Sequence, residues 1–199
     1  MKKLFAGSSM VAVLALAPGL ALAHPGLDHF HTVAGGVLHP LTGLDHVLAM
    51  VAVGLLAAQL GGRALWITPL GFVSMMLVGA MLGMAHITVP FAELGIALSV
   101  IVFGLILLLG IGLPTIGAAA LVGFFAIFHG YAHGREIPAA AETVSYAAGF
   151  VLATGLLHGV GIALGLLARE ATVSLRPRLF RAAGATVTVA GMALLAGAL

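Results

Sequence analysis

Long apolar stretches with almost no charge constrain the fold of this chain most. A helix of about 20 apolar residues crosses the hydrocarbon core of a membrane, and charged residues make up only 7% of the sequence, against about 25% in soluble domains. Lipid is therefore the expected solvent. We predict an all-α polytopic membrane bundle of about six transmembrane helices in a single domain, residues 24–199. The predicted spans are 38–60, 65–85, 91–111, 114–133, 143–168 and 180–199.

The first 23 residues have the pattern of a secretory signal peptide. Lys2 and Lys3 precede an apolar stretch that ends in the A-x-A cleavage pattern of residues 21–23. We expect cleavage, which places residue 24 on the outer face; an uncleaved first helix is the alternative. Six alternating spans then put five arginines inside and only Arg135 outside, as the positive-inside rule requires. The sequence therefore predicts a multi-pass inner-membrane protein whose N-terminus and histidine cluster are periplasmic.

Small residues recur at four-residue spacing within the spans, and the chain contains 28 glycines. Such pairs let helix backbones approach closely in lipid. The pattern predicts compact helix packing at the pairs 79/83, 130/134 and 161/165. The net charge of +2 comes from eight basic residues that form no patch in the sequence, which excludes a nucleic-acid partner.

Histidines and carboxylates gather at the outer ends of two spans. His39 and His46 are seven residues apart and share a helix face if the helix persists; the adjacent Asp45 then points elsewhere or orients a neighbouring histidine. His129 and His133 have the i, i+4 spacing with which one helix offers two imidazoles to one ion. Four or five ligands can therefore converge. The predicted metal ligands are His39, Asp45, His46, His129, His133 and Glu136.

Three further groups of polar residues carry weaker indications of a metal role, and a fourth group is interpreted as structural. His24, Asp28, His29 and His31 form either a transient metal-capture segment or a solvated tail. His158 lies near the predicted midplane, where an ionisable group is costly and often marks a pathway. His86 is a second candidate for the pathway or a partner in a helix-to-helix hydrogen bond. Glu93 and Glu142 are interpreted as helix N-terminal charges stabilised by the dipole.

The type of metal is restricted but not chosen by these ligands. The chain has no cysteine, so thiolate sites are excluded. Imidazole and carboxylate suit nickel, cobalt, zinc, copper(II) or iron(II), whereas calcium requires oxygen ligands.

Several motifs resemble those of the HupE/UreJ family. The segment HPLTGLDHVLAM at 39–50 is similar to its HPxxGxDHxxxM signature, and HPGLDH at 24–29, FHGYAHGREIP at 128–138 and ATGLLHGVGIALG at 153–165 extend the resemblance over nearly the whole mature chain. The resemblance implies a nickel or cobalt permease that supplies hydrogenase or urease assembly, not an enzyme, with no permanently bound cofactor. By motif matching it assigns the metal role to His39, Asp45, His46, His129, His133 and Glu136.

Two other functions remain open from the sequence. One is a membrane accessory protein that binds metal without translocating it, and the other is a membrane haem protein or metalloenzyme. No Walker A motif is present in the sequence. The expected partners are the transported ion, lipid and, as an open alternative, further copies of the chain.

Overall fold

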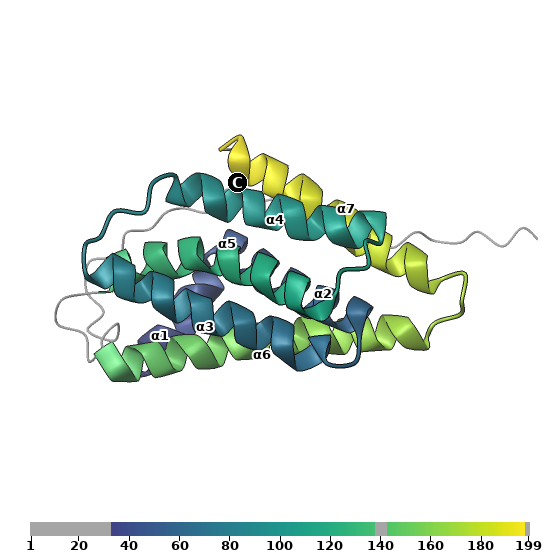
Figure 1. Ribbon diagram of the computed structural model, residues 1–199, viewed down its shortest axis with the longest axis horizontal. Helices are drawn as coiled ribbons and strands as arrows, with labels where there is room; N and C mark the ends of the chain where they lie inside the picture. Colours follow the sequence, from purple (N-terminus) through teal and green to yellow (C-terminus); the bar gives the residue numbers. More distant parts are fainter. Residues whose placement is uncertain (1–32, 138–142, 198–199) are drawn as a thin grey trace, which may run out of the picture.

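The computed structural model describes residues 33–137 and 143–197. The predicted signal peptide and the capture residues His24, Asp28, His29 and His31 lie outside these ranges, as does Glu142. The described residues form seven helices and no strand (Figure 1). The helices are α1 Val33–Thr42, α2 Leu44–Leu60, α3 Ala64–Met84, α4 Ala92–Leu109, α5 Thr115–Glu136, α6 Thr143–Glu170 and α7 Arg176–Leu195.

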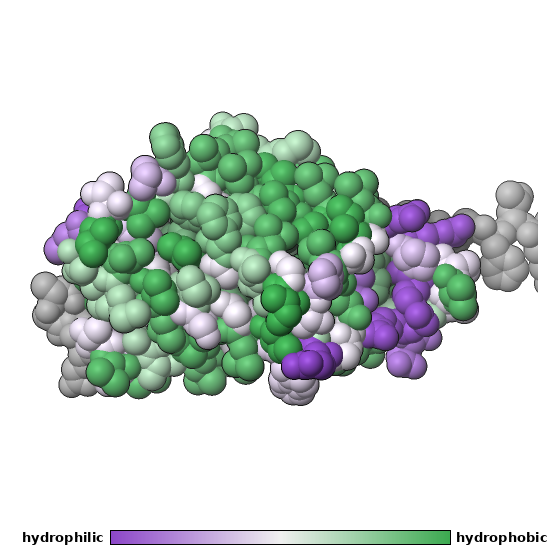
Figure 2. Space-filling view, in the orientation of Figure 1, coloured by the Kyte–Doolittle hydropathy of each residue, from purple (hydrophilic) through white to green (hydrophobic). Residues whose placement is uncertain are grey.

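Five of these helices, α3 to α7, are long and apolar enough to cross a membrane, and α1 with α2 makes a sixth span if the bent pair is counted as one. The predicted all-α membrane fold is confirmed. Figure 2 shows an apolar surface over the middle of the bundle and hydrophilic residues gathered where α6 meets α7. Large apolar side chains lie on this surface; Trp66 is 71% exposed and Leu167 is 69% exposed. Such exposure is expected for a surface that faces lipid.

The span expected at 38–60 is instead two helices that meet at Gly43 with a bend of 89°. Gly43 is extended, with φ −88° and ψ 112°, and therefore belongs to neither helix. Pro40 lies three residues earlier, within α1; it has no backbone N–H and therefore weakens the helix that precedes the bend. The condition for His39 and His46 to share one helix face is therefore not met, because the helix does not persist between them.

Close backbone contacts hold neighbouring helices together. Gly79 and Gly83 of α3 lie against backbone carbonyls of α5, while Gly130 and Gly134 of α5 lie against backbone carbonyls of α3. Gly161 of α6 contacts α2 in the same way. A Cβ atom at any of these positions would overlap the facing backbone, so the sequence prediction of small-residue packing is confirmed.

The antiparallel helices give the bundle two chemically different ends. The N-terminal ends of α4 and α6 and the C-terminal ends of α3 and α5 lie at one end, and the loop from α6 to α7 lies at the other (Figure 1). The first contains His133 and Glu136, and the second contains Arg169 and Arg176. We call them the histidine end and the arginine end.

Candidate metal site

Two helices bring three ligand atoms together at the histidine end. His39 Nε2 of α1 lies 2.9 Å from His133 Nδ1 and 3.0 Å from Glu136 Oε2 of α5. His133 Nδ1 lies 3.3 Å from the same Glu136 oxygen. An ion with bonds of about 2.1 Å places ligands at right angles about 3.0 Å apart. These three residues, called the triad below, can therefore bind one cation from one side. The remaining coordination positions of the ion stay open for water or other ligands.

The bend at Gly43 explains how His39 reaches α5. The bend turns α1 away from the axis of α2, and α1 then packs on α6, where Gly36 and Gly149 permit close backbone contact. His133 and Glu136 are three residues apart on α5 and share one face of that helix. The sequence predicted all three residues as metal ligands. Their proximity could not be predicted, because it depends on the bend between α1 and α2.

A second layer of imidazoles lies beneath the triad. His133 Nε2 is 3.2 Å from His46 Nδ1, and the His46 and His129 ring centroids are 5.6 Å apart. The triad histidines are 21% and 17% exposed, whereas His46 and His129 are 0% and 1% exposed. Phe150 of α6 packs its ring against His46 and His133, with centroids 5.2 and 4.7 Å away. The site therefore leads from a half-open mouth into the closed interior.

The protons of this imidazole chain can be placed from its inner end. The Thr154 hydroxyl donates to Met76 Sδ at 3.9 Å, so its oxygen accepts from His46 Nε2 at 3.3 Å. Neutral imidazole carries one proton, which leaves His46 Nδ1 to accept from His133 Nε2. His133 Nδ1 then accepts from His39 Nε2. His133 thus already presents a lone pair to the triad, and a cation bound there must displace the proton of His39 Nε2.

His129 is oriented by a separate hydrogen bond. Ser99 Oγ donates to the Ile96 carbonyl oxygen at 2.6 Å and lies 2.9 Å from His129 Nε2. Since the hydroxyl hydrogen is used, Nε2 must carry the proton and donate to Ser99. His129 Nδ1 is therefore the nitrogen with a free lone pair, and Ser99 acts as the outer partner that fixes a ligating histidine.

A cavity of about 250 Å³ opens beside the triad and carries further negative charge. His39, His133 and Glu136 line it, together with Asp45 and Glu93. Asp45 Oδ1 accepts the backbone N–H of His46 at 2.7 Å, so it fixes the start of α2 rather than an imidazole. Two carboxylates beside the triad attract a cation into the cavity.

The sequence predicted Glu93 only as a helix-terminal charge and not as a residue of the site. It does lie in the first turn of α4, but it also faces the cavity. One feature of the sequence could have indicated a role for Glu93 in the site. Its predicted span begins on the same side of the membrane as the predicted histidine ligands. Thr154 and Ser99 were missed as well, because a single hydroxyl within an apolar helix gives no distinctive pattern.

His158 lies deeper in the bundle, one helical turn beyond Thr154 on α6. It is 2% exposed, and neither ring nitrogen has a hydrogen-bond partner within the described residues. The Phe72 ring packs against it at 5.4 Å, and the buried Thr68 hydroxyl, one turn nearer the arginine end of α3, also lacks a partner there. Unpartnered buried polar groups are costly and call for an explanation such as a transient ion or water.

His86 is placed apart from the other predicted residues. It follows α3 in an exposed turn with a positive φ of 56°. Among the described residues it forms no hydrogen bond with the triad or with the buried imidazoles. Its proposed place in a pathway stays a prediction.

Comparison with known proteins identifies the family. The family model described as HupE / UreJ protein matches residues 11–194. The chain belongs to the HupE/UreJ family. It is also 45% identical over 190 residues to Protein HupE of Rhizobium leguminosarum bv. viciae, covering 96% of this chain and 97% of that protein. No solved structure matches the chain.

Proposed function

We propose that this HupE/UreJ protein is a permease that carries nickel or cobalt ions across the inner membrane to supply hydrogenase or urease assembly. Family membership supports a role in hydrogenase- or urease-associated nickel or cobalt uptake in general terms. The observation that carries the finer proposal is the continuity between the triad and buried His46 through His133, at 3.2 Å. A receptor that only holds metal does not need a ligand path into its core.

The proposed route begins in the cavity beside Asp45 and Glu93. A hydrated divalent ion exchanges water ligands for the triad and then passes to His46 and His129, where Nδ1 of each ring carries the lone pair. His158 offers the next nitrogen atoms on the way to the arginine end. Each step exchanges one imidazole for another, so that ligation is firm enough to select the ion and weak enough to release it.

The membrane potential supplies the driving force in this proposal. A charge gains about 2.3 kcal/mol per 100 mV, so a divalent ion that moves inward gains about twice that amount. This direction assumes that the histidine end is periplasmic, as the arginine distribution predicts. The proposal includes no catalytic step and no resident cofactor, because the ion is the cargo.

The decisive experiment measures radioactive nickel and cobalt uptake into proteoliposomes with an inside-negative potential. Wild-type protein should accumulate metal, and His46→Ala should not, while binding at the triad persists. Glu170→Gln is the matched control, because Glu170 is an exposed carboxylate at the arginine end. Binding without flux in wild-type protein would overturn the permease in favour of an accessory that delivers metal.

A further inference from the structure

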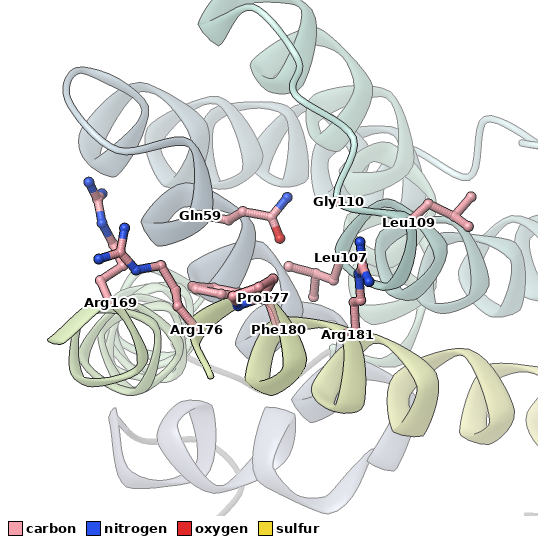
Figure 3. Close-up of a pocket in the computed structure, with 9 residues that line it drawn as sticks. All are labelled: Gln59, Leu107, Leu109, Gly110, Arg169, Arg176, Pro177, Phe180 and Arg181. Carbon is pink, nitrogen blue, oxygen red and sulfur yellow. The ribbon is translucent and has the colours of Figure 1, made fainter. Parts of the chain in front are cut away.

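The arginine end contains a pocket that the proposed metal route does not use. This pocket has a volume of about 310 Å³ and lies between the ends of α2, α4, α6 and α7. Its polar lining consists of Gln59, Arg169, Arg176 and Arg181, and Leu107 and Phe180 form apolar walls. Figure 3 shows Arg169 and Arg176 on one side of the Gln59 amide and Arg181 on the other. We call it the arginine pocket.

The charge of this pocket is not balanced by the protein that surrounds it. In the described residues the ion pairs involve only Glu136, at the opposite end of the bundle. Arg169 donates to the Ala58 carbonyl oxygen at 3.0 Å and thereby satisfies the end of α2. The side chains of Arg176 and Arg181 are exposed, and neither guanidinium group forms a hydrogen bond or an ion pair with any other described residue. Two guanidinium groups are therefore free to bind an anion, and guanidinium geometry favours phosphate.

A polar atom without a partner faces the same region. Gln59 Oε1 is buried and accepts no hydrogen bond from any residue in the described ranges. The Gln59 amide lies between the arginines in Figure 3. A buried acceptor of this kind is satisfied by a hydroxyl group of a bound molecule. The pocket thus combines sites for a phosphate and for a neighbouring hydroxyl.

An apolar groove adjoins the pocket. It has a volume of about 380 Å³ and is lined by Leu55, Leu164, Leu167, Leu179, Phe180 and Ala183. Phe180 lines both the groove and the arginine pocket. Leu164 and Leu167 precede Arg169 on α6, so the groove runs from the pocket toward the middle of the bundle. Its lining suits a hydrocarbon chain and contains no polar side chain.

We propose that the arginine pocket and this groove together bind one anionic phospholipid. Arg176 and Arg181, with Arg169, hold the headgroup phosphate, Gln59 Oε1 accepts a headgroup hydroxyl, and an acyl chain lies in the groove beside Phe180. Basic pockets between transmembrane helices bind anionic headgroups in this way. A soluble phosphate compound would use the arginines but would leave the groove empty, so the groove favours lipid.

The test is native mass spectrometry of the full chain in detergent, titrated with dioleoyl phosphatidylglycerol or dioleoyl phosphatidylcholine. Wild-type protein should retain one phosphatidylglycerol molecule and should prefer it over phosphatidylcholine by at least about tenfold. The double variant Arg176→Gln/Arg181→Gln should lose that preference. The matched control is Arg63→Gln/Arg178→Gln, which removes two exposed arginines of the same end that do not line the pocket. Equal losses in both double variants would overturn the site and indicate general surface attraction.

Two further arms separate the sources of phosphate. Glycerol 1-phosphate at millimolar concentration should not displace the lipid. Complete displacement would overturn the proposal of a lipid ligand and indicate a soluble phosphate compound instead. Ala183→Phe should fill the groove and weaken phosphatidylglycerol binding at least about tenfold while the chain keeps its melting temperature. Unchanged lipid binding by this variant would contradict the acyl-chain part of the proposal.

Discussion

His133 Nε2 lies 3.2 Å from His46 Nδ1, and this contact joins the half-open triad to the closed interior of the bundle. The other nitrogen of the same His133 ring faces His39 and Glu136. One imidazole therefore belongs to both layers of the site. Its two nitrogens cannot both be lone-pair atoms in the neutral ring, so an ion that advances from the triad to His46 requires the proton of His133 to move.

Replacement of His133 should damage binding and transport together. His133→Ala removes a triad ligand and the link to His46, and we expect nickel affinity to fall by more than about tenfold, the scale seen when a metal site loses a supporting partner. Uptake into proteoliposomes should become undetectable. Equilibrium dialysis and uptake are measured on the same preparation, with Glu170→Gln as the control. Wild-type affinity in His133→Ala would remove the triad from the proposal.

Acid should weaken metal binding through competition with protons. Each imidazole that ligates metal must be unprotonated, and the reference pKa of histidine is about 6.5. Protons compete with the metal ion for the same ring nitrogens, so the affinity for the ion falls as the pH falls. Where two imidazoles compete, the loss approaches about 100-fold per pH unit in the acid range.

The number of competing imidazoles can be checked by isothermal titration calorimetry between pH 5.5 and 8. His39→Gln should reduce the slope of log affinity against pH by about one unit, because one ligating imidazole is gone. Affinity that is independent of pH over this range would show that histidine does not ligate the ion.

Much of the fold could be predicted from the sequence, because the decisive signals are local. An apolar stretch of span length predicts a membrane helix wherever it occurs, and the helices α3 to α7 lie close to their expected ranges. The glycine spacings of α3 and α5 predicted close contact, and these glycines do face the partner helix. The identity of that partner could not be predicted, since one small residue fits many neighbours.

The candidate site was predicted less completely because it depends on a bend. Proline and glycine disfavour a continuous helix at Pro40 and Gly43, but these residue types do not determine an angle of 89°. That angle places His39 beside Glu136, 97 residues away in the chain. The deeper partners Thr154 and Ser99 depend on the distance between helices, which no local pattern encodes.

Thr154→Val should separate transport from binding. Valine keeps the shape of threonine in the core but removes the acceptor for His46 Nε2. The triad is untouched, so nickel affinity at the mouth should stay within about threefold of wild type. His46 is left with an unpartnered buried N–H, which costs about 1–3 kcal/mol. Proteoliposome uptake should therefore fall about tenfold or more. Equal losses of affinity and flux would contradict a distinct inner step.

The last prediction concerns the packing of α3 on α5, which positions His133. A Cβ atom at Gly130 would overlap the Met76 carbonyl group of α3, whereas a Cβ atom at Gly155 of α6 would meet nothing within 4 Å. Gly130→Ala should therefore destabilise the bundle by about 1–3 kcal/mol, as overpacking does.

Gly155→Ala should be neutral or slightly stabilising, because alanine favours helix over glycine by about 1 kcal/mol. Thermal unfolding in one detergent compares the two variants, and nickel affinity is measured in parallel. We expect Gly130→Ala alone to lose stability, and to lose affinity as well, because a shift of α5 displaces His133 and Glu136 from His39. A Gly130→Ala protein as stable as Gly155→Ala would show that α3 and α5 do not approach at this glycine.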